Sequence, residues 1–431
     1  MRYEPIDKAL FEANRARVAA LLAPGSLAVL NANDIMPTNA DGVLGFKQNA
    51  DLFYLSGVDQ PEATLVLFPD HPDPKQREIL FVKETSETMR IWDGPLLNKD
   101  EARATSGVQN VQWLGGFEGA FRGLLLRAEN VYLNLNEHAR SANAVPTHDD
   151  RFVRECRERY PLHTYRRLAP LLAQCRMVKS AAEIAQIRTA CAITDAGFRR
   201  VLGVLRPGLG EWEIEAEFAH EFLRRRAVGF AYPPIIAAGA SACILHYNQN
   251  HGTCRDGDLL LLDVGACWAH YCADMTRTIP VSGRFTPRQR AVYDAVLRVQ
   301  REAMALLRPG VMLKEYENEV RRVMDGALVD LGLITADAVS TQTEEDPPRR
   351  RYFMHGTAHH LGLDVHDVAL PDQPLEPGMV LTVEPGIYIR EENLGLRLEQ
   401  NVLITAAGNE NLLASIPIEP DEIEALMAQG R

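Results

Sequence analysis

One order of segments occurs twice in the second half of the chain, and it limits the possible fold more than any other feature. Arg-Pro-Gly-Leu at 206–209 precedes a predicted helix over 211–225, and Arg-Pro-Gly-Val at 308–311 precedes a predicted helix over 314–328. A long amphipathic helix is predicted before each of these turns, because apolar residues recur there at helical spacing. Two copies of one unit predict two similar halves that face each other across a pseudo-two-fold axis.

Each copy continues into a predicted strand that ends at an acidic residue. A turn leads into the strand 259–262 and then Asp263, and a similar turn leads into the strand 379–383 and then Glu384. Asp263 and Glu384 would then lie at equivalent strand ends. Two ordinary turn–strand units with similar turn residues would give the same pattern by chance, but the shared order of helix, turn and strand favours an internal duplication.

Composition excludes several classes of protein. The 431 residues include 46 Lys and Arg against 58 Asp and Glu, and the resulting net charge of −12 disfavours binding to nucleic acid. No stretch approaches the roughly 20 apolar residues that cross a bilayer, and the N-terminal residues lack the apolar core of a signal peptide. Seven cysteines without a Cys-X-X-Cys pair indicate reduced thiols. We therefore expect a cytoplasmic protein that binds neither nucleic acid nor a membrane.

The first half is predicted to be mixed α/β. Apolar residues at helical spacing predict a helix over 8–22, which stops before Pro24-Gly25. Short apolar runs predict strands at 27–31, 63–68, 79–82 and 131–135, with a proline-rich turn over 69–77 between the second and third.

A long helix is predicted to open the second half. Ser180 is its predicted N-cap, and Glu183 lies where a capping-box partner belongs. We place the domain boundary near Gln174, which gives a smaller domain over 1–173 and a larger one over 174–431. The polar, proline-containing segment 341–351 is predicted to be a surface loop.

Four carboxylates lie in or beside the apolar, strand-like segments of the second half. They are Asp263 and Asp274 in the first copy and Glu384 and Glu399 in the second. Burying a carboxylate is costly unless another group compensates its charge. Arg277 and Arg397 can pair with two of the four. We expect divalent cations to neutralise the remaining charge.

Four of the twelve histidines fall within a stretch of twelve residues that lies after Asp274 and before Glu384. They are His355, His359, His360 and His366. A neutral imidazole nitrogen is the usual metal ligand that joins oxygen donors. Four carboxylates and one histidine favour Mn²⁺ over a structural zinc ion, which prefers thiolates. Cys267 and Cys272 lack ligand spacing, and we expect them to be small core residues.

Two metal ions held by shared carboxylates form a hydrolytic site. Such ions lower the pKa of a bridging water and polarise the carbonyl group that the water attacks. The histidines that bind no metal could then hydrogen-bond the developing oxyanion or position the leaving nitrogen.

Each of these residues has an ordinary structural explanation when it is taken alone. An aspartate in the position of Asp263 or Asp274 is more often a turn or cap residue than a metal ligand. Glu384, which precedes Pro385-Gly386, could as well be a turn residue as a ligand. Glu399 could form a strand-edge salt bridge with Arg397. His246 would usually be a satisfied histidine in a half-buried strand, and the histidine cluster could be a solvated loop. Together these explanations leave the carboxylates without a countercharge, so the metal site is favoured.

Several short motifs point to one protein family. In the second half they are Leu245-His246-Tyr247, Asp263-Val264-Gly265, Asp274-Met275-Thr276-Arg277, His355-Gly356 with His359, His366-Asp367, Glu384-Pro385-Gly386-Ile387-Tyr388 and Arg397-Leu398-Glu399. With these motifs the sequence resembles the proline-specific metallopeptidases of the pita-bread fold, most closely the aminopeptidase P family. The segment 46–57 is similar to the accessory-domain signature of aminopeptidase P and prolidase. The resemblance implies an α/β (α+β) chain, with a smaller N-terminal α/β accessory domain and a C-terminal pita-bread catalytic domain that contains the repeat.

The resemblance also implies roles for individual residues. The metal ligands would be Asp263, Asp274, His359, Glu384 and Glu399, and they would hold two divalent ions. Manganese is the usual metal, with zinc, cobalt or iron(II) as alternatives. Glu384 would also take the proton from the attacking water, while His246, His355 and His366 would handle the scissile carbonyl and the proline. Arg397 would hold the carboxylates in place, and Tyr388 and Trp92 would line the substrate pocket.

In family terms the reaction releases an N-terminal residue that is followed by proline. An X-Pro bond has a tertiary amide nitrogen without an N–H, so a pocket shaped for the pyrrolidine ring can recognise it. The implied substrates are peptides with proline at the second position, and the implied assembly is a homodimer or homotetramer. A prolidase, which cleaves only Xaa-Pro dipeptides, is the nearest alternative. A catalytically inactive pita-bread module that binds peptides is a remote one.

The chain departs from the family pattern at two places. Lys47 stands where the accessory signature commonly has arginine. In the loop that contains Trp92, Pro95 and Asn98 stand where arginine and glycine are expected. In relatives this loop can reach the active site of a neighbouring subunit, so the change bears on oligomer contacts and on the preferred substrate length.

Overall fold

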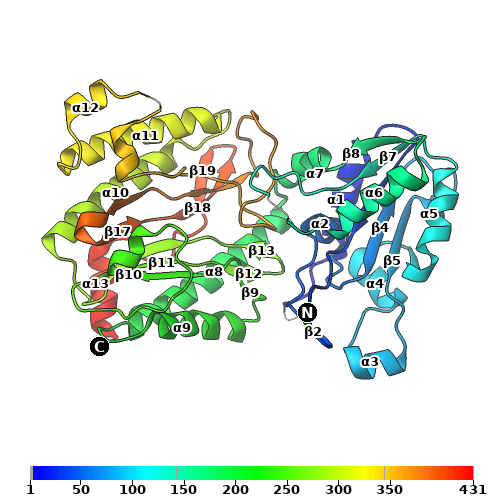
Figure 1. The fold of residues 1–431 in the computed structure, drawn as a ribbon, viewed down its shortest axis with the longest axis horizontal. Helices are drawn as coiled ribbons and strands as arrows, with labels where there is room; N and C mark the ends of the chain where they lie inside the picture. Colours follow the sequence, from blue (N-terminus) through cyan, green and yellow to red (C-terminus); the bar gives the residue numbers. More distant parts are fainter. Residues whose placement is uncertain (1–2, 142–143, 344, 431) are drawn as a thin grey trace. The chain divides into compact units, whose positions relative to one another are not determined.

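The computed structural model describes residues 3–141, 144–343 and 345–430, and its contacts divide the chain into two compact units (Figure 1). The N-terminal unit runs from Tyr3 to Arg176, and the C-terminal unit begins at Met177. Each unit has its own core, so each is described by itself. The observed division lies beside the boundary that we placed at 173/174.

The N-terminal unit is built on a six-stranded mixed sheet. Its strands are β1 (Ser26–Asn31), β4 (Ala63–Leu67), β5 (Glu78–Val82), β6 (Asn110–Trp113), β7 (Asn130–Leu133) and β8 (Thr164–Arg167), in the order β6-β5-β4-β1-β7-β8. The pairs β1–β4 and β4–β5 are antiparallel, whereas β1–β7, β5–β6 and β7–β8 are parallel. The short strands β2 (Pro37–Asn39) and β3 (Gly42–Val43) pair separately.

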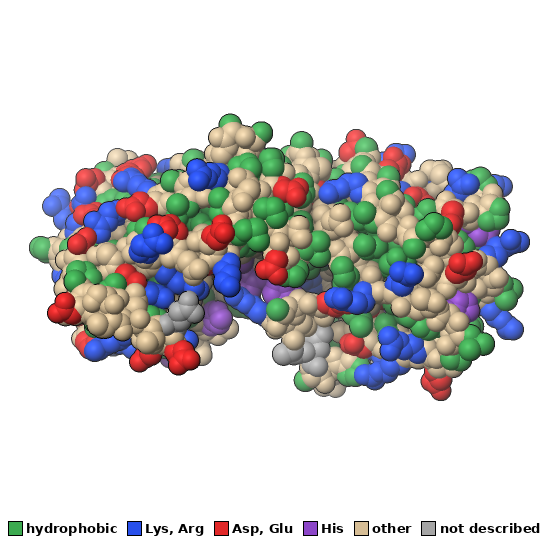
Figure 2. Space-filling view, turned by 90° about the horizontal axis from the view of Figure 1, so that it is seen from above, with side chains coloured by type: hydrophobic (Ala, Val, Ile, Leu, Met, Phe, Trp, Pro, Cys, Tyr) green, Lys and Arg blue, Asp and Glu red, His purple; other side chains and the backbone are tan. Residues whose placement is uncertain are grey.

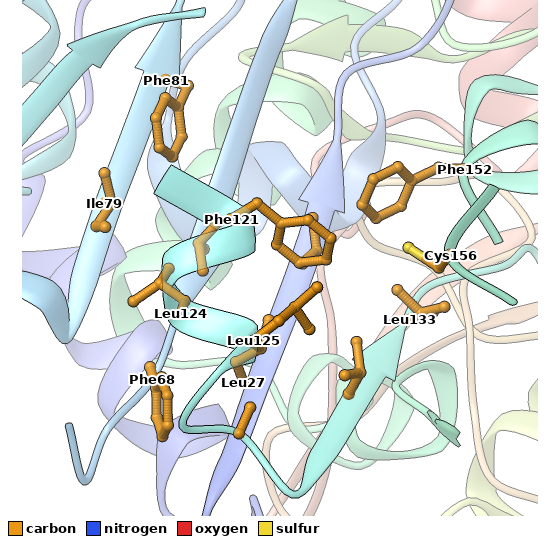
Figure 3. Close-up of a cluster of buried hydrophobic side chains, with 14 residues drawn as sticks. Leu27, Phe68, Ile79, Phe81, Phe121, Leu124, Leu125, Leu133, Phe152 and Cys156 are labelled. Atoms are coloured by element: carbon orange, nitrogen blue, oxygen red, sulfur yellow. The ribbon is translucent and has the colours of Figure 1, made fainter. Parts of the chain in front are cut away.

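Helices cover both faces of this sheet. The helices α1 (Lys8–Ala19), α2 (Ala50–Ser56), α4 (Lys99–Ser106) and α7 (Ala169–Arg176) pack together on one face. The helices α5 (Phe117–Leu125) and α6 (His148–Arg159) lie on the other, where they bury a hydrophobic cluster against β1, β4, β5 and β7 (Figure 3). In that cluster the rings of Phe121 and Phe152 lie 5.6 Å apart. Helices on both faces bury the central strands β1 and β4 completely, and the residues of these strands are accordingly mostly apolar.

Most predicted elements of the N-terminal half are confirmed. The expected helix and four strands appear as α1, β1, β4, β5 and β7, and the proline-rich turn joins β4 to β5 through a short 3₁₀ turn at Pro74–Gln76. The strands β6 and β8 were not predicted. The residues of β8 are polar and largely exposed, because it lies at the edge of the sheet.

The altered loop after Trp92 has a local structural explanation. Asn98, which stands where a glycine is expected, is the N-cap of α4 and forms a capping box with Glu101. The helix α3 (Glu87–Asp93) precedes this loop and presents Ile91 and Trp92 to solvent, with 77% and 83% of their surface exposed. The asparagine therefore starts a helix where a glycine would leave its first turn without a side-chain cap.

Two pairs of long helices form the outer layers of the C-terminal unit. The first pair is α8 (Ala181–Val204) with α9 (Glu211–Arg224), and the second is α10 (Pro287–Leu306) with α11 (Leu313–Asp330). Figure 1 shows the two pairs on opposite sides of the strands. Gly208 and Gly310 have φ values of 97° and 86° in the turn that joins each pair, a conformation that favours glycine. The predicted capping box between Ser180 and Glu183 starts α8.

The strands between these helices repeat in the same way. In the first copy β11 (Leu259–Asp263) pairs with β10 (Ile235–Ala238) and β14 (Thr276–Pro280), and in the second β15 (Val380–Val383) and β19 (Gly408–Asn411) pair with β18 (Gln400–Thr405). Smaller sheets are formed by β9 (Gly229–Phe230), β12 (Ala266–Trp268) and β13 (Tyr271–Cys272), and by β16 (Gly386–Ile389) and β17 (Leu394–Arg397). Helix pair and antiparallel strands thus recur in one order, as the duplicated sequence predicts.

The remaining elements of this unit are short or terminal. The helix α13 (Pro420–Gln429) packs on α8, and α12 (Ala336–Ser340), which was not predicted, precedes the surface segment 341–351. That segment is irregular in its described residues except for a 3₁₀ turn at Pro348–Arg351. Cys267 and Cys272 are 6% and 1% exposed, which confirms them as core residues.

The surface carries charges of both signs. Figure 2 shows acidic and basic side chains interspersed over the visible face. Among the described residues, every helix is too short or too polar to pass through a lipid bilayer.

Candidate active site

The four predicted carboxylates lie at the ends of strands from both copies of the repeat. Asp263 is the last residue of β11, and Asp274 lies in the turn before β14. Glu384 directly follows β15, and Glu399 lies between β17 and β18. The pairing of β11 with β14 places Asp263 opposite Thr276, and Thr276 in turn accepts a backbone hydrogen bond from Glu399 at 3.0 Å. The hydrogen bond between Glu399 and Thr276 therefore joins the two copies at this point.

Distances between side chains define one acidic cluster. Single ligand atoms of Asp274, His359 and Glu399 all lie within 4.8 Å of one another. His359 Nε2 is 3.4 Å from Asp274 Oδ2 and 3.7 Å from Glu384 Oε1. Asp263 joins the cluster through Tyr232, as described below. The structure thus brings all five residues together.

Burial and like charge make these carboxylates hard to ionise in the bare protein. Burial, followed by the charge of Asp263, raises the pKa of Asp274. Burial and the charge of Asp274 raise the pKa of Glu399, and burial and the charge of Glu399 raise the pKa of Glu384. Glu399 Oε1 is buried and has no hydrogen-bond partner among the described residues. Asp274, His359 and Glu399 could together hold a metal ion, which would reduce the repulsion between the carboxylates.

Tyr232 connects the two aspartates of the first copy. Its hydroxyl lies 2.7 Å from Asp263 Oδ1 and 2.5 Å from Asp274 Oδ1. Burial, and then the negative charges of Asp263 and Asp274, raise the pKa of Tyr232, so its hydroxyl keeps its proton and remains a donor. Sequence reasoning missed this residue, because a tyrosine before Pro233-Pro234 carries no motif, and its partners lie more than thirty positions away.

Arg397 is the basic residue that holds the cluster. Its Nη2 donates to Asp263 Oδ2 at 2.5 Å, Nε donates to the Thr276 hydroxyl at 3.0 Å, and Nη1 donates to the Tyr388 hydroxyl at 2.8 Å. The Thr276 hydroxyl donates in turn to Glu399 Oε2 at 2.8 Å. The planar guanidinium spreads its donors over three nitrogens and so reaches three separate partners, whereas a lysine carries all three donors on one nitrogen.

Arg277 corrects one expectation. We considered it as a partner for a site carboxylate, but its hydrogen bonds go to the backbone carbonyls of Thr276, Glu399, Ile416 and Pro417 and to the side chain of Gln400. Burial lowers the pKa of Arg277 to about 10. Its side chain points into the core behind the cluster, where it joins β14 to the segment before α13.

His355 and Tyr388 form a hydrogen-bonded pair beside the cluster. His355 Nε2 lies 2.8 Å from the Tyr388 hydroxyl, and Nδ1 lies 2.7 Å from the Gly356 carbonyl oxygen. A carbonyl can only accept, so Nδ1 carries the proton and Nε2 accepts from Tyr388. Burial, followed by the charge of Arg397, lowers the pKa of His355 to about 4, so the ring is neutral near pH 7.

The remaining predicted site residues are His366, His246 and Trp92, and each has a different environment. His366 stacks edge-on against His359, with ring centres 4.2 Å apart. His246 is exposed and follows the 3₁₀ turn Gly239–Cys243, so it is not in a half-buried strand. Among the causes that lower the pKa of His355, the charge of His246 comes after burial and the charge of Arg397. Trp92 belongs to the N-terminal unit, and its role in substrate binding stays a prediction.

Glu317 on α11 is a second residue that sequence reasoning missed. Its Oε1 accepts hydrogen bonds from the backbone N–H of Thr357 at 2.8 Å, the Thr357 hydroxyl at 3.0 Å and the backbone N–H of Ala358 at 3.1 Å. The Thr357 carbonyl accepts from the backbone N–H of Glu384 at 2.9 Å. Glu317 therefore fixes the loop between His355 and His359.

Comparison with known proteins follows the same division of the chain. Residues 185–406 match the model of metallopeptidase family M24, and residues 11–132 match the aminopeptidase P N-terminal domain. The Xaa-Pro aminopeptidase of Escherichia coli K12 is 37% identical over 439 residues, which cover 99% of each chain.

Solved structures agree with this result. A Glu-to-Ala variant of E. coli aminopeptidase P in complex with substrate, and zinc-substituted E. coli aminopeptidase P in complex with product, each superpose with a TM-score of 0.89 at 36% identity. Both comparisons cover 99% of this chain and 100% of the other. The family and fold that the motifs implied are confirmed. The chain belongs to metallopeptidase family M24, a family of hydrolases, and carries the N-terminal domain of aminopeptidase P in front of its peptidase domain.

Proposed function

We propose that the protein hydrolyses the N-terminal Xaa-Pro bond of peptides and releases the N-terminal amino acid. The observation that carries this proposal is the buried cluster of Asp263, Asp274, His359, Glu384 and Glu399, which joins both copies of the repeat. The names of the E. coli relatives supply the substrate class, since they are called Xaa-Pro aminopeptidase and one is solved with substrate.

The cluster suits two divalent cations. Four carboxylates and one imidazole are hard, oxygen-rich donors, and Glu399 Oε1 is a buried oxygen that lacks a partner among the described residues. Burial, followed by the negative charge of a neighbouring carboxylate, raises the pKa values of Asp274, Glu384 and Glu399, and bound cations would offset both causes. The donor set favours Mn²⁺, with Zn²⁺, Co²⁺ or Fe²⁺ as alternatives. Two such ions would lower the pKa of the attacking water and polarise the scissile carbonyl.

The side chains of the protein would carry the remaining steps. Glu384 has a raised pKa and lies at the edge of the cluster, so its carboxylate is suited to take a proton from water and return it to the leaving proline nitrogen. His246 and His366 would donate hydrogen bonds to the carbonyl oxygen as negative charge develops on it. His355 would hold the Tyr388 hydroxyl and the ring-binding side of the pocket in place.

The proline preference has a physical basis in the substrate. The X-Pro nitrogen has no hydrogen to donate, and its ring fixes the backbone angle φ. A pocket with apolar walls around the ring loses nothing by lacking an acceptor for that nitrogen. We propose that His355 forms part of this wall, and that Tyr388, which is fully buried, supports the ring of His355 from behind.

The decisive experiment measures metal and activity on the same preparation. Protein purified without chelator should contain close to two equivalents of transition metal and should release the first residue of Xaa-Pro-Yaa tripeptides. Removal of the metal should abolish activity, and Mn²⁺ should restore it. Less than one equivalent of metal, with no activation by Mn²⁺, would favour a binding module instead.

A prolidase differs from an aminopeptidase P only in substrate length. A panel of Xaa-Pro dipeptides and Xaa-Pro-Yaa tripeptides therefore separates the two. We expect cleavage of tripeptides, because both domains match those of the aminopeptidases P over 99% of the chain. Cleavage of dipeptides alone would assign the protein to the alternative.

We also propose that the protein is cytoplasmic and forms a homodimer or homotetramer. None of its seven cysteines forms a disulfide in the described part of the chain, which supports a reducing compartment. Ile91 and Trp92 are neighbouring exposed apolar side chains on α3, and we propose them as part of a contact between copies, because contiguous exposed apolar surface can mark an interaction site. Analytical ultracentrifugation of the wild-type protein and the Trp92→Ser variant tests this assembly.

A further inference from the structure

Lys179 and Asp367 form a buried ion pair in the C-terminal unit, outside the acidic cluster. Lys179 Nζ lies 2.9 Å from Asp367 Oδ2, and each side chain is 1% exposed. An ion pair is expensive to bury, since both charges lose their hydration, and apolar residues of similar size would often be as stable. We therefore ask whether this ion pair holds the surrounding chain in one specific conformation.

Lys179 is anchored by the chain on both sides. Its backbone N–H donates to the Gly378 carbonyl at 2.9 Å, in the turn that precedes β15. The next residue, Ser180, is the N-cap of α8 and forms a capping box with Glu183. The ammonium group thus projects from a fixed point between the first helix of one repeat and a strand of the other.

Asp367 is linked to His359 through a single carbonyl group. The backbone N–H of Asp367 donates to the His360 carbonyl oxygen at 2.9 Å, and His359 Nδ1 lies 3.0 Å from the same oxygen. Because that oxygen can only accept, Nδ1 carries the proton, and the lone pair of Nε2 faces Asp274 and Glu384. The position of the His360 carbonyl therefore decides how His359 points into the cluster.

Asp367 also fixes the residue before it. His366 directly precedes Asp367, and its ring lies 4.2 Å from that of His359. The loop closes tightly around the ion pair: a Cβ added at Gly362 would come within 2.1 Å of Asp367 Oδ2 and 2.9 Å of Lys179 Cε. Movement of the Asp367 carboxylate would thus move both ends of the loop 359–366.

We propose that the Lys179–Asp367 ion pair positions His359 and His366, and so sets both the metal affinity and the turnover of the site. This inference rests on the proposed function, because that function gives the two histidines their roles. Lys179 and Asp367 are positioning residues, since neither lies in the acidic cluster. One ion pair can position both His359 and His366 because these residues lie at opposite ends of the same loop, 359–366.

The test replaces both charges together, so that no uncompensated charge stays buried. The Lys179→Met/Asp367→Asn double variant removes the ion pair with little change in volume. The Lys179→Gln/Asp367→Asn double variant replaces it with a neutral hydrogen bond, and it keeps the test decisive if the first variant does not fold. A matched control is Arg200→Met/Glu217→Gln, which neutralises a half-exposed ion pair between α8 and α9 in the same unit.

Three quantities are measured for each full-length protein: the thermal unfolding midpoint, the Kd for Mn²⁺ by calorimetric titration, and kcat and KM for an Xaa-Pro-Yaa tripeptide at saturating Mn²⁺. We expect the Lys179→Met/Asp367→Asn variant to bind Mn²⁺ about 10- to 100-fold more weakly. Its kcat should stay about 10-fold low even when the metal sites are full, because His366 is still displaced, while KM changes less. The Gln/Asn variant should fall between it and the wild type, and the control should keep the wild-type Kd and kcat.

The outcomes separate this inference from the proposed function. If the wild-type protein binds no Mn²⁺ and cleaves no tripeptide, the proposed function fails, and the inference fails with it. If the wild type binds and cleaves, but a folded charge-neutral variant keeps its Kd and kcat, the ion pair has no positioning role. A lower unfolding midpoint with unchanged Kd and kcat would likewise show that the pair serves stability alone.

Discussion

Arg397 donates a hydrogen bond to Asp263 at 2.5 Å, although the two residues lie 134 positions apart in the chain. Asp263 ends a strand of the first repeat, and Arg397 ends a strand of the second. The contact therefore ties the two halves of the duplicated region together at the proposed metal site. Because the guanidinium is buried, its loss would leave the Asp263 carboxylate without its strongest donor.

Replacement of this arginine should weaken metal binding and catalysis together. The Arg397→Lys variant keeps the positive charge but cannot reach Asp263, Thr276 and Tyr388 at once. We expect kcat/KM to fall about 10- to 100-fold and the Mn²⁺ affinity to fall in parallel. Steady-state kinetics and metal titration check this. Arg200→Lys on α8 is the control, and equal effects of the two substitutions would contradict the assignment.

Two neighbouring histidines should respond differently to alanine substitution. His359→Ala removes a proposed ligand, and we expect it to lose bound metal and most activity. His366→Ala should lower turnover while leaving the metal content nearly intact, because its role is proposed to be toward the substrate. Elemental analysis and tripeptide hydrolysis on the same samples decide between the roles. If His366→Ala also strips the metal, then His366 is a ligand and the assignment is wrong.

Tyr232→Phe should move metal loss to a higher pH. The hydrogen bond from Tyr232 lowers the pKa of Asp274, although burial raises it overall. Removing the hydroxyl raises this pKa further, so protons compete with the metal at a less acidic pH. We expect the pH at which half of the Mn²⁺ is lost to rise by about one unit or less. Dialysis at a series of pH values, followed by metal analysis, measures the shift. An unchanged midpoint would mean that the hydroxyl does not bear on ligand ionisation.

Asp149 should make the N-terminal unit less stable as the pH rises. Burial raises the pKa of Asp149 from 3.8 to about 7, against the hydrogen bond that it accepts from Asn31 at 2.9 Å. Below pH 3.8 both the folded and the unfolded chain carry the proton, and this group makes no difference. Between pH 3.8 and 7 the unfolded chain loses the proton while the folded chain keeps it, so stability falls by up to ~1.4 kcal/mol per pH unit.

The Asp149→Asn variant tests this directly, because an amide oxygen can still accept from Asn31. Relative to the wild type, it should stabilise the N-terminal unit at pH 8 by about 2–4 kcal/mol and have little effect near pH 4. Urea unfolding, followed by hydrogen exchange in β1 and β4, reports on this unit alone. The same stabilisation at both pH values would show that Asp149 is not protonated in the folded protein.

The sequence by itself determined the architecture and the composition of the site. Helical and strand periodicity, the Ser180–Glu183 capping box and the duplicated turns depend on residues close in the chain, so local rules predict them. The edge strands β6 and β8 escaped prediction because each has only four residues without a continuous apolar run, and those of β8 are largely exposed. The proposed donor set could also be predicted from the sequence, because four carboxylates in apolar segments are costly to bury without a countercharge.

Only the tertiary structure decided which side chains form hydrogen bonds or ion pairs with the residues of the site. Tyr232, Glu317 and the Lys179–Asp367 pair have no local signature, and each acts on a residue at least 31 positions away. Arg277 and Arg397 look equivalent in the sequence, yet one turns into the core and the other toward Asp263. A hydrogen bond between distant residues depends on how whole strands and helices pack against one another. The spacing of residues in the sequence does not predict that packing.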